Sequence, residues 1–199
     1  EPYRRQRQMC IRDSAVSQKI PCVLVNSYSD KLPSVLSDNR KGAYLAGRYL
    51  IEHGHKTVAL LAGVRSYLSN QERTAGFLQA FQEEGLSIPP ELILETGSWL
   101  YDAAEKVCLN FFNTYTGEMP TALFAFNDRL ATGAINAICK TGRTVPDDVS
   151  VIGYDNLGYY NIISPRITTV ETHIEAISES TVMHMIWQLN NGSCLPVKV

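Results

Sequence analysis

The sequence predicts an α/β fold with doubly wound parallel sheets, and two observations support this. Short apolar segments alternate along the chain with amphipathic helices, which is typical of βαβ units. Several apolar segments also end at a residue that can hydrogen-bond a ligand or, as glycine, let a ligand approach the backbone. These residues are Asn26, Gly63, Asn127 and Asp155. Ligands of such sheets bind beyond the carboxyl ends of the strands, so these positions indicate a binding site.

The strands are expected where apolar, often β-branched residues run without a polar break, as in a parallel sheet buried on both faces. The main ones are PCVLVN (21–26), TVALLAG (57–63), ELILETG (91–97), TALFAFN (121–127) and VSVIGYD (149–155). Two further extended stretches are expected in LPSVLSDN (32–39) and ITTV (167–170).

The helices are expected between these strands, because capping residues precede segments with helical apolar periodicity. They span about 38–54, 69–84, 102–114, 128–140 and 174–189. On the second helix the residues expected to face inward are Ala75, Phe77, Leu78 and Phe81. On the last helix the apolar residues are Ile174, Ile177, Val182, Met185, Ile186 and Leu189.

The composition of the 199 residues, 45% hydrophobic and 19% charged, is ordinary for a soluble globular protein. No apolar run is long enough to span a membrane, and no signal-peptide core follows the basic N-terminal stretch. The five scattered cysteines lack a CxxC pair, which suits a reducing compartment, and Cys22, Cys108 and Cys139 are expected to be buried. We therefore expect a cytoplasmic protein that contacts no membrane.

The patterns of common enzymes and metal sites are not found in this sequence. It contains no GxSxG, HExxH or P-loop motif, and its cysteines and histidines lack the spacing of metal ligands. We therefore expect no enzyme, no cofactor and no metal site.

The first fourteen residues are interpreted as a non-native tail. The segment RRQRQMCIRDS, residues 4–14, resembles the translation of an adapter oligonucleotide used in transposase-based sequencing libraries. The alternative is a basic arm that binds nucleic acid. We expect this segment to be disordered or to pack against nothing native, with Met9 and Ile11 outside the core.

Candidate ligand contacts each have a structural alternative. Asn127 can donate to and accept from sugar hydroxyls, but Asn127 and Asp128 also suit helix capping, so that one could cap while the other faces a cleft. Asp155 can accept from two neighbouring hydroxyls, or it can hydrogen-bond within its own turn. Arg73 can bind hydroxyls or a carboxylate, or it can pair in solvent with Glu72 or Glu83. Trp99 can stack on a sugar or shield the core.

Four segments together resemble the effector-binding domain of LacI/GalR-family transcriptional regulators. These are residues 21–63, ERTAGFLQAF (72–81), FAFNDRLATGAINAICKTGRTVPDDVSVIGYDN (124–156) and SPRITTVET (164–172). The block VPDDVSVIGYDN, together with the Asn-Asp pair upstream, is the most specific part. The resemblance covers residues 15–199 without a large gap.

The resemblance implies a periplasmic-binding-protein-like fold of type I, with two α/β subdomains, an effector cleft between them and a dimeric functional unit. Residues 15–38 and 171–192 would be the remnant of the headpiece-proximal subdomain, and 39–170 the distal one. Residues 193–199 would begin a truncated closing segment. The family's N-terminal helix-turn-helix headpiece would be missing.

The resemblance also implies five effector-binding residues: Asn26, Arg73, Trp99, Asn127 and Asp155. Asn26 stands where the family often has aspartate, which keeps an acceptor and removes the charge. The implied function is a regulator domain whose sugar or sugar-derivative effector controls operator binding through the headpiece. A periplasmic sugar-binding protein of a transporter is the nearest alternative, and an enzyme on a similar fold is the second.

We predict that residues 15–199 do not bind DNA specifically. Without segment 1–14, the 18 Lys and Arg residues fall to 14 and the 20 Asp and Glu residues to 18, a net charge of −4. A chain without a basic excess cannot neutralise many phosphates. An electrophoretic mobility shift assay with competitor DNA at physiological salt should show no discrete complex, and the appearance of one would contradict the prediction.

Overall fold

The computed structural model describes residues 11–158 and 166–191. The chain forms two compact units. Unit 1 consists of Glu1–Ser37 and His173–Val199, and unit 2 of Asp38–Thr172. Each unit is described by itself.

Unit 2 is built on a parallel sheet of five strands in the order β4-β3-β5-β6-β7. The strands are β3 (Val58–Ala62), β4 (Ile93–Glu95), β5 (Ala122–Ala125), β6 (Ser150–Asp155) and β7 (Thr168–Glu171). The predicted parallel sheet is confirmed, and the short stretch 167–170 joins it as an edge strand. All carboxyl ends therefore lie at one edge of this sheet.

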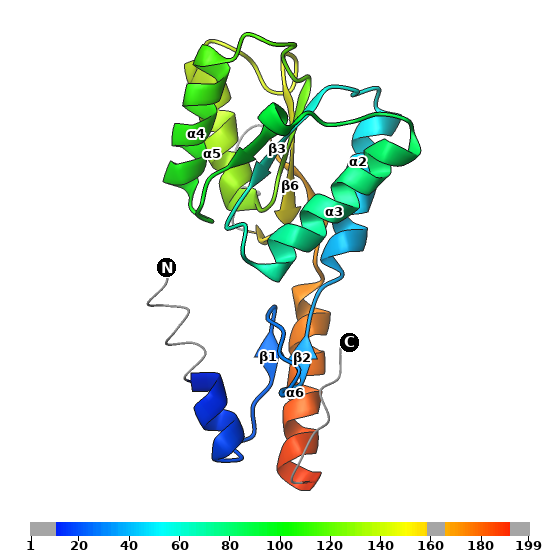
Figure 1. Ribbon diagram of the computed structural model, residues 1–199, viewed down its shortest axis with the longest axis vertical. Helices are drawn as coiled ribbons and strands as arrows, with labels where there is room; N and C mark the ends of the chain where they lie inside the picture. The colour runs from blue at the N-terminus through cyan, green and yellow to red at the C-terminus, as the bar shows by residue number, and fades with distance from the viewer. Residues whose placement is uncertain (1–10, 159–165, 192–199) are drawn as a thin grey trace. The chain divides into compact units, whose positions relative to one another are not determined.

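Helices cover both faces of the sheet, as the prediction of a doubly wound fold requires (Figure 1). They are α2 (Asn39–Glu52), α3 (Leu68–Glu83), α4 (Tyr101–Thr114) and α5 (Asp128–Lys140), with a short 3₁₀ turn at Pro90–Leu92. α2 and α3 pack together on one face, and α4 and α5 on the other. Asp38 caps α2, because its Oδ1 accepts from the backbone N–H of Lys41 at 2.9 Å.

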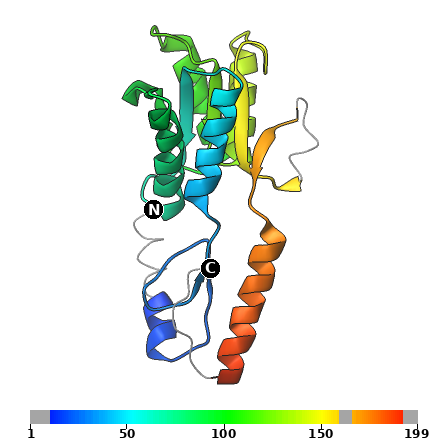
Figure 2. The same ribbon diagram turned by 90° about the vertical axis from the view of Figure 1, so that its right-hand side faces the viewer.

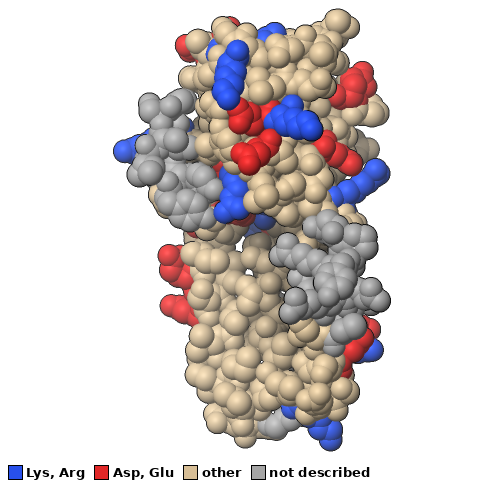
Figure 3. Space-filling model, turned by 90° about the vertical axis from the view of Figure 1, so that its left-hand side faces the viewer, with Lys and Arg blue, Asp and Glu red and all other residues tan. Residues whose placement is uncertain are grey.

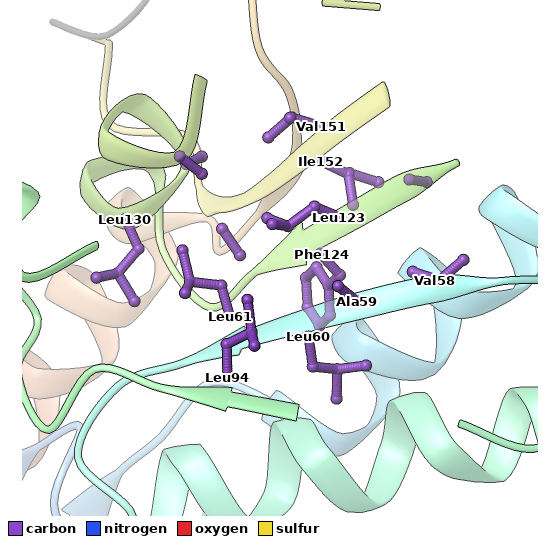
Figure 4. Packing of buried hydrophobic residues seen from close by; sticks show 14 of the residues in the cluster. Val58, Ala59, Leu60, Leu61, Leu94, Leu123, Phe124, Leu130, Val151 and Ile152 are labelled. Atoms are coloured by element: carbon purple, nitrogen blue, oxygen red, sulfur yellow. The ribbon is translucent and has the colours of Figure 1, made fainter. Parts of the chain in front are cut away.

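The core of unit 2 is apolar on both sides of the central strands. Every residue of β3 and β5 is buried, which explains why these strands show no alternation of polar and apolar residues. Phe124 of β5 stacks on Phe77 of α3 with ring centroids 4.7 Å apart. Side chains from β3, β4, β5, β6 and α5 pack against one another in this layer (Figure 4).

The inward face of α3 differs from the prediction. Phe77 and Phe81 are buried as expected, but Ala75 is exposed and Leu78 is only half-buried. The buried stripe instead includes Asn70 and Arg73. Apolar periodicity could not find this face, because two of its positions carry polar side chains.

The cysteines also depart in part from the prediction that they are small core residues. Cys108 is buried, as expected, while Cys22 is half-buried and Cys139 is exposed. Cys139 lies in the last turn of α5, beyond the buried face of that helix.

Unit 1 contains a parallel pair of very short strands, β1 (Leu24–Val25) and β2 (Ser34–Val35), beside the long helix α6 (Ile174–Asn191) (Figure 1). The predicted strand 21–26 is thus reduced to two paired residues. Next to it, the buried Gln188 side chain accepts from Cys22 N at 2.8 Å and donates to Cys22 O at 3.1 Å. An amide side chain thereby satisfies both backbone groups of Cys22, just before the paired residues of β1.

α6 is one continuous helix (Figure 2). Many of its apolar side chains are exposed. The sequence predicts that Ile174, Ile177 and Met185 are more exposed than their hydrophobicity suggests. Ile174 is 43% exposed, as predicted, and Met185 is half-buried, but the prediction is wrong for Ile177, which is buried. The other exposed apolar residues of the helix are Val182, Met183, Ile186, Trp187 and Leu189.

The adapter-like segment is described only from residue 11 onward, so Met9 lies outside the described residues. Residues 11–17 are helical, Ile11 is 60% exposed, and Arg12 donates to Ser27 Oγ. The contact with Ser27 differs from the expectation that 4–14 packs against nothing native. It arises because the helix directs the long arginine side chain toward the loop after β1.

Among the described residues, no helix is both long and apolar enough to cross a bilayer. On the face seen in Figure 3, acidic and basic side chains are interspersed over the residues of unit 2. That face therefore presents no continuous basic surface.

We expect amide hydrogen exchange on expressed residues 15–199 to show strong protection within 57–155 and little within 21–26. The first range holds the buried sheet, whereas the second holds only two paired strand residues. Mass spectrometry of exchanged peptides would measure this directly. Uniform protection across both ranges would contradict the expectation.

Candidate functional site

The carboxyl-end edge of the unit 2 sheet carries a cluster of polar side chains on an otherwise apolar core. Asp155 ends β6, Asn127 follows β5, and Arg73 reaches this edge from the second turn of α3. Because β3, β5 and β6 are parallel neighbours, residues far apart in the sequence meet here.

Arg73 is the centre of this cluster and is only 7% exposed. Its Nε donates to Asn39 Oδ1 at 2.9 Å, and its Nη2 donates to Asp155 Oδ1 at 3.2 Å. Its Nη1 donates to the backbone oxygen of Phe126. The alternative of a solvated arginine paired with glutamate is therefore wrong, because the guanidinium is buried and uses its donors inside the fold.

The face of the Arg73 guanidinium lies over the ring of Tyr154, with the central carbon 3.6 Å from the ring centroid. Tyr154 is almost fully buried, and burial raises the pKa of its phenol to about 12. The ring therefore stays neutral and offers its π face to the cation. The Tyr154 ring thus contacts the face of the guanidinium, while the N–H groups at its edge make the hydrogen bonds.

Asp155 is the acidic partner of Arg73 and the more accessible of the two, with 27% of its side chain exposed. Burial raises the pKa of this carboxyl to about 6, and the favourable charge of Arg73 only partly offsets this effect. Its backbone is left-handed, with φ at +102°, and Asn156 follows at +50°. The strained turn directs a partly exposed carboxylate along the edge of the sheet.

Asn127 acts as the N-cap of α5, since its Oδ1 accepts from Leu130 N at 2.7 Å. Its Nδ2 lies 3.5 Å from the backbone oxygen of Trp99. The neighbouring Asp128 is 2% exposed and bonds within the fold, so it does not face an open cleft. The capping alternative therefore holds for Asn127, and its amide nitrogen donates to the backbone of Trp99.

Trp99 is half-buried in the loop after β4 and packs directly on the end of β3. A Cβ added at Gly63 would lie 2.5 Å from the Trp99 ring, so the ring rests against the glycine. Tyr67 meets it edge-on, with ring centroids 6.1 Å apart. Asn70 Oδ1 accepts from Gly63 N at 2.9 Å and ties α3 to the same strand end.

The structure therefore brings four of the five predicted residues to one edge of unit 2. Arg73 contacts Asp155 directly, and Asn127 contacts the backbone of Trp99. Asn26 belongs to unit 1, where it is exposed, with a left-handed φ of +49°.

Sequence reasoning missed three residues of this site, namely Asn39, Asn70 and Tyr154. The sequence places the two asparagines at the starts of predicted helices and the tyrosine in a predicted strand. The signal that could have found Asn70 is its spacing from Arg73 and Phe77, because residues three and four apart share one face of a helix. The described residues include no group of three or more metal-ligating side chains.

Comparison with known proteins identifies similar chains. Residues 48–194 match the family described as periplasmic binding protein-like domain. The HTH-type transcriptional repressor PurR of Pasteurella multocida is 35% identical over 176 residues, which make up 87% of this chain and 52% of that repressor. The chain thus spans about half the length of this curated relative.

Two solved structures show the same fold. A LacI transcriptional regulator from Bacillus cereus subsp. cytotoxis has a TM-score of 0.85 at 26% identity, over 95% of this chain and 67% of that one. A sugar-binding LacI-family regulator from Escherichia coli, complexed with phosphate, has a TM-score of 0.80 at 26% identity, over 94% and 68%.

We predict that the raised pKa of Asp155 makes the stability of the protein depend on pH. Between 3.8 and about 6 the native carboxyl keeps a proton that the unfolded chain has released. Its contribution to the free energy of unfolding is therefore full below 3.8 and falls by about 3 kcal/mol as the pH rises to about 6. Urea unfolding of the native chain at several pH values would measure this slope.

Asp155→Asn should flatten that slope, because the amide does not titrate and asparagine tolerates a left-handed backbone. A smaller slope of the same sign should remain from Asp128, since burial raises its pKa too. The exposed Asp102→Asn serves as the control and should leave the slope unchanged. Equal slopes in Asp155→Asn and the native chain would rule out this assignment.

Proposed function

Because this chain belongs to the family of periplasmic binding protein-like domains, in the form that LacI-family regulators carry, we propose that it is the effector-sensing domain of a DNA-binding transcriptional regulator. The effector is a sugar or sugar derivative. The parent protein acts as a homodimer and contacts operator DNA through an N-terminal headpiece. The match to a named repressor, rather than to an enzyme, supports a binding role.

The observation that carries this proposal is the Arg73–Asp155 pair at the carboxyl-end edge of the sheet. A carboxylate accepts hydrogen bonds from two neighbouring hydroxyl groups, and a guanidinium donates to hydroxyl oxygens. Arg73 is the one hydrogen-bond partner that the described residues provide for the Asp155 carboxylate. The partly exposed oxygen atoms of the Asp155 carboxylate are therefore available to a polyhydroxylated ligand.

The other proposed contacts complete the chemistry of a sugar site. The Nδ2 of Asn127 adds a donor beside Trp99, whose ring offers an apolar surface to the C–H groups of a sugar. The resemblance to LacI-family regulators also implies Asn26, whose amide has both a donor and an acceptor. The resemblance of this chain to a sugar-binding regulator from Escherichia coli supports the choice of ligand class.

Effector binding would act by population shift. A ligand that makes better contacts in one arrangement of the parent protein favours that arrangement by its difference in affinity. This mechanism requires a site whose affinity for the ligand differs between the two arrangements. Arg73 and Asp155 suit this role, because each already bonds within the fold and can share its donors or acceptors with a ligand.

Isothermal titration calorimetry of the chain with a panel of pentoses, hexoses, sugar acids and sugar phosphates tests the proposal. Planar nitrogen bases form a second panel, since an arginine and a carboxylate can also pair with their edges. Saturable binding of a sugar supports the proposal. If only a nitrogen base binds, the proposed ligand class is wrong, but the proposed site still stands.

We predict that Asp155→Ala or Arg73→Ala weakens the affinity for the sugar found in that panel by ~1.5–3 kcal/mol, the usual scale for hydrogen bonds to charged groups. Arg73→Lys keeps the charge but loses the planar fork, and should weaken binding while disturbing the fold less. Arg48→Ala, which removes a surface pair with Glu84, is the matched control and should bind normally. Full affinity in both Asp155→Ala and Arg73→Lys would exclude this site.

A further inference from the structure

The turn after β6 holds an unfavourable backbone conformation at the point where the site carboxylate lies. Two consecutive residues that are not glycine, Asp155 and Asn156, have φ values of +102° and +50°. Such conformations are unfavourable for residues with a side chain and persist only where the surroundings enforce them. Contacts outside the turn must therefore hold it.

The buried carboxylate of Asp128 supplies the strongest of these contacts. Asp128 is the first residue of α5 and only 2% exposed. Its Oδ2 accepts from the backbone N–H of Leu157 at 3.1 Å, and its Oδ1 accepts from Thr169 Oγ1 at 2.6 Å. Burial raises the pKa of the Asp128 carboxyl, and the hydrogen bonds from Thr169 and from the backbone only partly offset this effect.

The neighbouring strand leaves room for this carboxylate. A Cβ added at Gly153 would lie 2.4 Å from Asp128 Oδ1, well inside contact distance. A side chain at position 153 would therefore displace the Asp128 carboxylate from the turn. β6 thus carries a glycine immediately before Tyr154 and Asp155, at the place where Asp128 needs the space.

Two weaker contacts tie the same turn to the end of β7. Thr172 Oγ1 donates to the backbone oxygen of Asp155 at 3.1 Å, and Asn156 Nδ2 donates to Glu171. The side chains that make these two contacts, Thr172, Asn156 and Glu171, are all at least partly exposed, whereas Asp128 is buried. Asp128 is therefore the contact least open to competition from water.

We infer that Asp128 is a positioning residue for the effector site. Its buried carboxylate holds the backbone at Leu157 and the side chain of Thr169, and thereby directs Asp155 toward Arg73. This inference rests on the proposed function for its effect on ligand affinity, but its effect on the turn does not depend on any ligand. Asp128 itself touches no effector, because its oxygen atoms are used inside the fold.

A simpler role for Asp128 would be to stabilise α5, since acidic residues in the first turn favour the helix dipole. Asp102 holds the corresponding place in the first turn of α4 and is exposed. Asp102→Ala is thus a matched control that removes a first-turn acid from another helix of unit 2. A role limited to the helix dipole would give similar results at the two positions.

Two variants separate the hydrogen bonds of Asp128 from its charge. Asp128→Ala removes all of the acceptors. Asp128→Asn keeps the shape, because its carbonyl can accept from Leu157 N while its amide donates to the Thr169 hydroxyl, which can turn to accept. Thr169→Val removes one contact only and covers the case in which Asp128→Ala fails to fold.

The experiment measures amide hydrogen exchange by NMR on the ligand-free 199-residue chain. We expect Asp128→Ala to speed exchange at residues 155–157 about tenfold or more, with Thr169→Val intermediate and Asp128→Asn and Asp102→Ala close to the native chain. Unchanged exchange at 155–157 in both Asp128→Ala and Thr169→Val would overturn the inference. Faster exchange along all of α5 with none specific to the turn would also overturn it.

Two further readouts use the same variants. Asp128→Asn should lower the pKa of Asp155, because the charge of Asp128 raises it, and NMR titration of the side-chain carboxyl carbon reports this value. With a ligand in hand, Asp128→Ala should weaken affinity about tenfold or more and Asp128→Asn much less. If no ligand binds the native chain, the proposed function fails while the exchange result still decides the role of Asp128.

Discussion

The buried guanidinium of Arg73 is the constraint on which the edge of the unit 2 sheet depends. A guanidinium is charged at physiological pH and is costly to bury without hydrogen-bond partners. Here it has partners from α2, from the end of β5 and from β6, and an aromatic ring beneath it. Removing any one partner would leave a buried donor unsatisfied, so these elements must keep their relative places.

This constraint explains why the site stands on a rigid base although its ligand-facing groups lie in loops. The core below it is formed by strands whose residues are all buried, and it contributes stability but no chemistry. The polar groups of the proposed site lie where the strands end. Arg73 and Asp128 are two buried charges on helices of opposite faces, and both act on the short segment around Asp155.

The same segment has a second property that suits a sensing domain. Asp155 is held in a left-handed conformation, its carboxyl has a raised pKa, and its backbone oxygen accepts from Thr172, the last residue of unit 2. The backbone of Asp155 is therefore hydrogen-bonded to the residue at which the chain leaves unit 2. Under the proposed function, this segment is where the effector would contact the domain.

The sequence by itself determined the parallel sheet of unit 2, the extent of α5 and the edge at which the polar residues gather. Those features depend on local periodicity and on capping residues a few positions away. Only the tertiary structure decided that Arg73 is buried in place of Ala75, that Asn127 caps while Asp128 holds the turn, and that Gly153 makes room for a carboxylate. The partners of Arg73 lie 34, 53 and 82 residues away along the chain. No local pattern encodes contacts of that range, since they exist only once the strands have been brought side by side.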